Sequence, residues 1–211
     1  LLDELARYFI DSGFRFKALH RLILNSAAYQ LSAHTPERPG GEDPLEDMLF
    51  ARYVPRKLPA EVLLDAIVQV TGVDEEFRNY PEGTSPKELI ASIGATHFLT
   101  TFGMPRRDVM EARSQAPSMA QSLNLMNGDE VEGKVRAKDN VLAKLLNAGK
   151  PDAEIVSDLY VRSFARPPSE EEAAAMQQYV ASEVAAGRER RRAIENVLWA
   201  ILNLKEFQLN R

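Results

Sequence analysis

The stretch KLPAEVLLDAIVQVTG, residues 57–72, carries the strongest helix signal in the sequence. Pro59 suits the first turn of a helix, and Gly72 is a natural stop after the last turn. Between them, apolar residues recur at the spacing of a helix that buries one face. That face consists of Val62, Leu63, Ile67 and Val70. The stretch therefore predicts a core helix against which other helices pack.

Two further amphipathic helices are expected before this stretch. Residues 1–10 place apolar side chains along one helical stripe, and Gly13 then breaks the pattern. A second helix follows, with a face spaced for burial that extends to Leu31. Together they predict an αα-hairpin. Residues 32–44, with three prolines and a pair of glycines, predict a loop, and a short helix is expected over residues 45–52.

Helical periodicity also dominates the rest of the chain. Helices are expected over residues 85–99, 118–126, 129–147, 152–164, 169–186 and 190–209, with a strand as the alternative for ATHFLTTFG at 95–103. No stretch alternates convincingly with the two-residue period of a strand. We therefore predict an all-α fold, a single irregular helical domain of helix pairs over residues 1–211. A separable C-terminal helical lobe, with sub-lobes 1–150 and 151–211, is the alternative.

Composition limits the possible classes of function. The 211 residues are 45% hydrophobic and 27% charged, which is ordinary for a chain that buries its own core. The absence of Cys excludes disulfides, thiolate metal ligands and a Cys nucleophile. A net charge of −5 argues against a nucleic-acid partner, and the arginine run at 188–192 is interpreted as a solvated helix face. No apolar run is long enough to span a membrane.

Motifs for catalysis or cofactor binding are not found in the sequence. His20, His34 and His97 lack metal-ligand spacing, and no nucleophile, phosphate-binding or haem-attachment motif is present. We therefore predict no metal site and no cofactor. Trp199 lies in a mostly apolar last helix, which we interpret as core rather than as a partner groove. Because the chain starts without Met inside an amphipathic pattern, we interpret it as a C-terminal fragment of a longer protein.

The stretch EARSQAPSMAQSLNLMNG, residues 111–128, is unusually rich in polar side chains for a helix start. Ser118 and Gln121 have the spacing of a capping box, and Asn127-Gly128 predicts a left-handed stop. Capping does not account for the other polar residues, which either make contacts inside the fold or belong to a ligand pocket. The candidate site residues in this stretch are Glu111, Arg113, Gln121, Asn124 and Asn127.

Glu61 and Asp65 form a second candidate cluster, because they lie four residues apart on one face of the predicted core helix. Like charges at this spacing disfavour each other unless a cation lies over them. Arg56 and Arg113 are the expected cations. Metal binding or acid–base chemistry by the two carboxylates is the alternative to an ion-paired cluster.

Five stretches, in order, resemble a known family. They are LLDELARYFIDSGFRFKALHRLILNSAAYQLS, RKLPAEVLLDAIVQVTG, the block from FLTTFGMPRRD to EARSQAPSMAQSLNLMNG, LYVRSFARPPSEEE and ENVLWAILNLKEFQLN. They are similar to the motifs of the planctomycete-specific domain PSD-one, a domain of unknown function. One departure is VMEARS at 109–114, where many members have a Cys-Glu-Cys-like stretch. A thiol or metal role at that place is therefore not available to this chain.

The resemblance implies a location and neighbouring domains but no chemical activity. Members of this family are large, exported, multidomain proteins of planctomycetes, verrucomicrobia and their relatives. They often carry cytochrome-c-like domains, so neighbouring domains of the same polypeptide are the implied partners. A periplasmic or otherwise exported location is likewise implied. The family supplies no accepted activity and no accepted catalytic residues.

Two hypotheses of function follow from these observations. The first is a non-catalytic helical docking module of an exported multidomain protein, favoured by the family architecture and by the lack of a catalytic constellation. The second is a carbohydrate-binding or hydrolytic domain, with a pocket between the Glu61/Asp65 helix and the 111–128 block.

Overall fold

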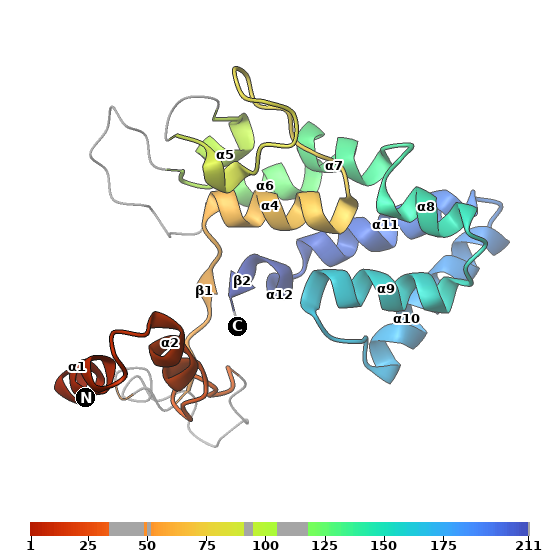
Figure 1. Cartoon of the computed structure of the whole chain (residues 1–211). Coiled ribbons are helices and arrows are strands. Elements are labelled where there is room, and N and C mark those ends of the chain that lie inside the picture. Colours follow the sequence, from red (N-terminus) through yellow and green to blue (C-terminus); the bar gives the residue numbers. More distant parts are fainter. Residues whose placement is uncertain (34–48, 50–51, 91–94, 105–117, 211) are drawn as a thin grey trace. The chain divides into compact units, whose positions relative to one another are not determined.

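Helices make up nearly all the regular structure of the computed structural model, which describes residues 1–33, 49, 52–90, 95–104 and 118–210 (Figure 1). The described residues contain one small sheet, in which the two-residue strands β1 (Arg56–Lys57) and β2 (Leu209–Asn210) pair. The prediction of an all-α fold is confirmed. The expected helix at 45–52 lies almost entirely outside the described residues.

The chain forms two compact units, residues 1–56 and residues 57–210. The predicted sub-lobe boundary between residues 150 and 151 falls inside the second unit. The first unit contains α1 (Leu2–Asp11) and α2 (Phe16–Leu24). The second contains α4 (Ala60–Thr71), the 3₁₀ helix η1 (Pro86–Glu88), α5 (His97–Thr101), α6 (Met119–Asn127), α7 (Asp129–Arg136), α8 (Val141–Asn147), α9 (Asp152–Phe164), α10 (Glu170–Ala185), α11 (Arg190–Asn203) and α12 (Lys205–Gln208).

The first unit contains the predicted αα-hairpin. Gly13, with φ of +71°, makes the reversal between α1 and α2, and the Phe14 N–H then donates to the Phe9 carbonyl over 2.9 Å. α2 ends at Leu24 rather than at Leu31, because the Ser26 hydroxyl donates to the Ile23 carbonyl and begins a turn. Both helices are described in full, and neither contains a buried residue. The expected burial of their apolar faces is therefore not found among the described residues of the first unit.

The stretch at 57–72 forms the predicted core helix, α4. It begins after Pro59 and ends at Gly72, whose φ of +67° is left-handed. A Cβ at Gly72 would also meet the Val141 side chain at 2.8 Å, so two constraints select glycine there. Leu63, Leu64 and Ile67 are fully buried in the core. Val70 of the predicted apolar face is buried as well, whereas Val62 is half-buried, and Leu64 is an addition to the predicted face.

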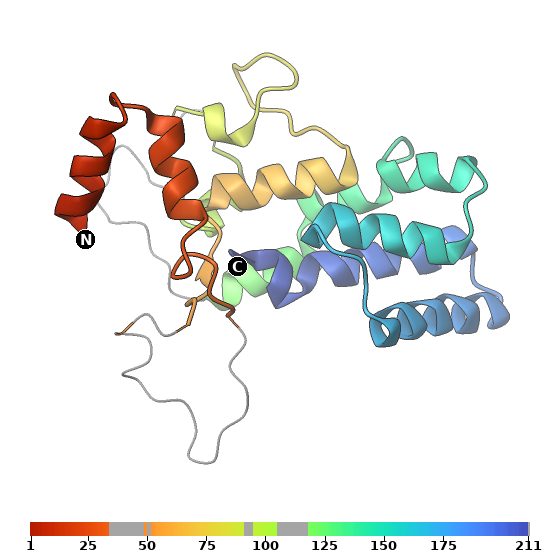
Figure 2. The same cartoon turned by 60° about the horizontal axis from the view of Figure 1, so that its bottom comes forward.

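α11 is the second core helix, and it contacts α6, α7, α9, α10 and α12. α7 and α9 each contact both α4 and α11, so these four helices enclose the core of the second unit. α9, α10 and α11 lie side by side in both views of the molecule (Figures 1 and 2). The predicted last helix is interrupted at Leu204, after which α12 and β2 complete the described chain.

A single asparagine divides the helix expected over residues 129–147 into α7 and α8. The Asn140 side-chain oxygen accepts from the Ala143 N–H over 2.8 Å and so caps α8. Its side-chain nitrogen donates to the Lys134 and Val135 carbonyls, at 3.2 and 2.7 Å, and so satisfies the end of α7. Asn140 is fully buried, and one side chain therefore holds the ends of two helices together.

The continuous helix expected over residues 85–99 is wrong, as is the alternative of a strand at 95–103. The structure has η1, then residues 91–94 outside the described set, then the short helix α5. The Ile90 N–H donates to the Tyr80 hydroxyl over 3.0 Å. In a continuous helix that N–H would donate to the Pro86 carbonyl, so this bond to Tyr80 replaces helix propagation.

Candidate functional site

The carboxylate of Asp65 lies in a cluster of donors supplied by the chain itself. Lys87 approaches one carboxylate oxygen at 2.7 Å, and the Gln69 amide donates to the same oxygen over 2.7 Å. The Ser85 hydroxyl donates to the other oxygen over 3.0 Å. Among the described residues, the cation at Asp65 is therefore Lys87, although Arg56 and Arg113 were the expected ones. Asp65 anchors η1 to α4.

Of the other expected members of the Glu61/Asp65 cluster, the structure describes Glu61 and Arg56 but not Arg113. Glu61 is half-buried in the first turn of α4, and Arg56 is exposed in β1. Glu111 and Arg113 lie outside the described residues. Within those residues, no group of three or more His, Asp or Glu could hold a metal ion.

Gln121 does not complete the predicted capping box. The Ser118 hydroxyl caps α6 by accepting from the Gln121 backbone N–H over 3.2 Å, as predicted. The Gln121 side chain instead accepts from the Lys57 ammonium over 2.9 Å and donates to the Thr101 carbonyl over 3.3 Å. It joins α6 to α5 and to β1. Gln121 thus makes structural contacts inside the second unit.

The turn between α6 and α7 is not the predicted left-handed stop. Gly128 has φ of −72° and ψ of +131°, an extended conformation open to any residue. Its N–H donates to the Asn124 carbonyl over 2.7 Å, so the two backbones approach closely. The Asn124 side-chain oxygen lies against the same glycine and is buried with no partner in the described structure. Close approach, rather than φ, therefore requires glycine at this position.

Gly128→Ala is accordingly expected to destabilise the chain by about 1–3 kcal/mol, because the new Cβ would clash with the Asn124 carbonyl oxygen. Gly133→Ala is the matched control, since nothing lies within 4 Å of a Cβ there. Gly133 is inside α7, so its replacement should stabilise the chain by about 0.5–1 kcal/mol. Urea unfolding of the two variants measures both changes. Equal changes would contradict this account of Gly128.

Many of the exposed large apolar side chains among the described residues belong to the hairpin of the first unit. Phe9 contacts the rings of Phe14 and Phe16, at centroid distances of 5.5 and 5.0 Å. Leu2 and Phe16 are 80% and 67% exposed. The exposed apolar side chains of residues 1–29 are those of Leu1, Leu2, Tyr8, Ile10, Phe14, Phe16, Leu22, Ile23, Leu24 and Tyr29. Patches of this kind on a protein commonly mark an interaction surface.

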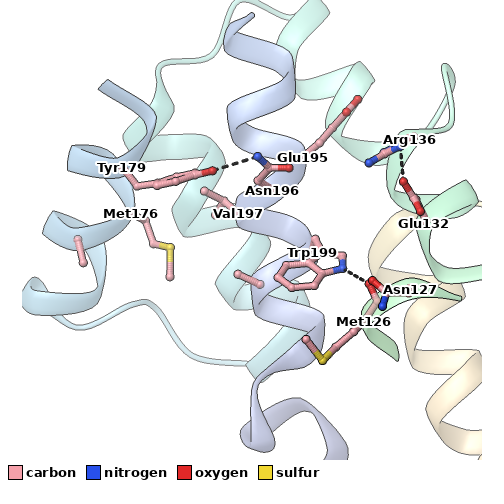
Figure 3. Close-up of a pocket in the computed structure, with 12 residues that line it drawn as sticks. Met126, Asn127, Glu132, Arg136, Met176, Tyr179, Glu195, Asn196, Val197 and Trp199 are labelled. Carbon is pink, nitrogen blue, oxygen red and sulfur yellow. Dashed lines mark hydrogen bonds and ion pairs between the residues drawn. The ribbon is translucent and has the colours of Figure 1, made fainter. Parts of the chain in front are cut away.

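A groove in the second unit is the other candidate site (Figure 3). α11 forms its floor, and α10 and the α6–α7 pair form its walls. The groove has a volume of about 690 Å³. It is lined by Met126, Asn127, Glu132, Arg136, Ala175, Met176, Tyr179, Glu195, Asn196, Val197, Trp199 and Ala200.

Trp199 corrects the interpretation of the last helix as core throughout. Leu198, Ile201 and Leu202 are buried, but Trp199 is half-buried and lines the groove. Its indole N–H donates to the Met126 carbonyl over 3.0 Å and fixes the ring against the end of α6 (Figure 3). Of the sequence-predicted site residues that the structure describes, Asn127 is the one that lines this groove.

The sequence contained a weak signal for the groove. Met176 and Tyr179, three residues apart on α10, and Asn196 and Trp199, three apart on α11, each share a helix face. Amphipathic spacing of this kind also describes an ordinary buried face. The wall supplied by α6 and α7 depends on contacts between segments more than 60 residues apart in the chain, such as Trp199 with Met126.

Comparisons with known proteins identify the family of the chain but no chemical activity. Within the described residues, no helix has both the length and the apolar character needed to cross a bilayer. No curated protein and no solved structure matches the chain. A family model described as PSD1, protein of unknown function (DUF1553), matches residues 1–180. The resemblance to PSD-one is thereby confirmed, and the chain belongs to this family of unknown function.

Proposed function

We propose that this chain is a non-catalytic docking module of an exported multidomain protein. In this proposal the apolar face of the α1–α2 hairpin packs against a neighbouring domain of the same polypeptide. The observation that carries the proposal is the hairpin itself, which forms two regular helices whose apolar faces are not buried by the described residues of the first unit. Isolated helices of 9 and 10 residues are marginal in water, so their stability depends on packing.

The exposed side chains indicate what such a partner surface offers. Burying one Phe or Leu side chain contributes about 1.5–3 kcal/mol, so several together can hold two domains in contact. Residues 12–33 contain Arg15, Lys17 and Arg21 but no Asp or Glu. α1 in contrast carries Asp3, Glu4 and Asp11. The complementary surface is therefore apolar, with acidic groups opposite α2 and basic groups opposite α1.

Hydrogen exchange tests this proposal directly. In the chain alone, the amides of α1 and α2 should exchange quickly, while those of α4 and α11 stay protected. In the full natural polypeptide, the amides of α1 and α2 should become protected. Strong protection of α1 and α2 in the chain alone would overturn the proposal, since it would show that this chain covers the hairpin. Unchanged fast exchange in the full polypeptide would also overturn it.

Surface variants separate docking from folding. Ile10→Gln and Phe16→Gln should each reduce the protection of α1 and α2 in the full polypeptide, because both side chains are more than half exposed and apolar. Val161→Gln on α9 removes a half-exposed apolar side chain from the second unit and should leave that protection unchanged. All three variants should unfold at urea concentrations close to that of the parent chain.

A further inference from the structure

We propose that the groove over α11 is a binding site for a compact, uncharged small molecule with a flat apolar body. The site is separate from the docking surface on the hairpin, and this proposal does not depend on the docking function. A volume of about 690 Å³ lies in the range of small-molecule pockets, about 300–1,000 Å³.

The length of the groove favours a compact occupant over a partner helix. Its floor on α11 extends from Glu195 to Ala200, and its wall on α10 extends from Ala175 to Tyr179. Each stretch spans only about 6–8 Å along its helix axis. A docking helix uses anchors at i, i+3 or i+4, and i+7, which need about 10 Å of groove. A ligand of two or three fused rings fits the available length.

The charges around the groove favour an uncharged occupant. Arg136 pairs with Glu132 on the α7 wall. Glu195 pairs with Arg191 at 2.8 Å and with Arg192 at 3.2 Å. Each charged side chain in the lining therefore has a partner of opposite charge within the chain. An ionised ligand would lose its hydration without gaining an unpaired counter-charge.

The remaining lining groups favour a flat ligand with a polar edge. The Trp199 N–H is already donated to Met126, so Trp199 offers its ring (Figure 3). Met126 and Met176 supply flexible sulfur-containing side chains that pack well against aromatic rings. The Tyr179 hydroxyl accepts from the Asn196 amide over 3.0 Å. That bond leaves the Tyr179 O–H and the Asn196 side-chain oxygen for the edge of a ligand.

Methionine-methyl NMR with a defined probe tests the site. 2-Naphthol is neutral, flat and able to donate and accept one hydrogen bond. Its titration should shift the Met126 and Met176 methyl signals and the indole N–H signal, which is unique because Trp199 is the one Trp of the chain. Met119, 80% exposed on α6 but outside the groove, should not shift. 2-Naphthalenesulfonate should bind more weakly, because its charge finds no unpaired partner.

Two matched substitutions decide the outcome. Ala175→Phe places a ring in the groove from an exposed position on α10 and should weaken 2-naphthol binding about tenfold or more, a change of about 1.4 kcal/mol. Ala174→Phe, at the adjacent exposed position, should leave the affinity unchanged. The proposal is overturned if 2-naphthol gives no saturable shift, if Met119 moves with the groove signals, or if Ala175→Phe binds as the parent does. Tighter binding of the sulfonate would overturn the uncharged ligand class.

Discussion

Replacing Lys134 by Met is expected to destabilise the second unit by about 3–5 kcal/mol, the range seen when one partner of a buried ion pair is removed. The Lys134 side chain is only 6% exposed. Its ammonium donates to the Val73 and Asp74 carbonyls, at 3.0 and 2.8 Å, and pairs with Glu75 at 2.9 Å. A methionine has similar length, so the loss would come from two unpaired carbonyls and an uncompensated carboxylate rather than from a cavity.

Urea unfolding monitored by Trp199 fluorescence measures this effect within the unit that contains Lys134. Lys144→Met on α8 is the matched control, because the Lys144 side chain is exposed, and it should change stability by about 0.5 kcal/mol or less. Adding Glu75→Gln to Lys134→Met should restore part of the loss by removing the stranded charge. Equal effects of Lys134→Met and Lys144→Met would contradict the assigned role.

Lys134 also illustrates which parts of the structure could be predicted from the sequence and which could not. Helical periodicity located α4, α9 and α10 closely, because each is a separate amphipathic segment with its own start and stop signals. It failed over residues 129–147, where α7 and α8 have one continuous apolar pattern. The break depends on Asn140, whose bonds to Lys134 and Val135 form only when both helices are in place. The contacts of Lys134 could not be predicted either, since nothing in the sequence indicates that it lies beside residues 73–75.

The candidate site residues show the same limit. Asp65 was predicted as a site residue because it lies four residues from Glu61 on one helix face, and Gln121 because it has the spacing of a capping box with Ser118. Both bind partners outside their own helices: Lys87 and Ser85 for Asp65, Lys57 and Thr101 for Gln121. These partners are 20 to 64 residues away in the chain. The groove over α11 was not predicted from the sequence, because its lining is mostly apolar and resembles a buried helix face.

Arg166 should give the second large effect, with a distinct dependence on pH. Its guanidinium donates to both oxygens of Glu172 on α10, each over 2.8 Å, and to both oxygens of Glu206 on α12, over 3.0 and 2.8 Å. It also lies 5.6 Å from the Tyr160 ring centroid. Arg166→Gln is expected to cost about 2 kcal/mol at neutral pH. This value is set at the low end for a charged network, because about a third of the Arg166 side chain faces solvent, which screens the pairs.

The pH dependence separates this network from ordinary packing. Arg166, and next the Ser169 backbone N–H, lower the pKa of Glu172 from its ordinary value of 4.5 to about 2. A pKa that is lower in the folded state stabilises the fold above the unfolded pKa, and that contribution is lost as pH falls. The parent chain should therefore lose stability between about pH 5 and pH 2 through Glu172. Arg166→Gln, in which the pKa of Glu172 returns toward 4.5, should lose much less over the same range.

Urea midpoints of the parent and of Arg166→Gln, measured from pH 6 to pH 2.5, should therefore converge as the pH falls. The convergence follows because protonated Glu172 no longer pairs with Arg166, so removing Arg166 then costs less. Arg162→Gln is the matched control, since Arg162 pairs with Asp158 on an exposed face of α9. Its midpoint should remain close to that of the parent at each pH. Parallel curves for the parent and Arg166→Gln would mean that Arg166 stabilises the α9–α10–α12 junction through packing against Tyr160 and Phe164 rather than through charge.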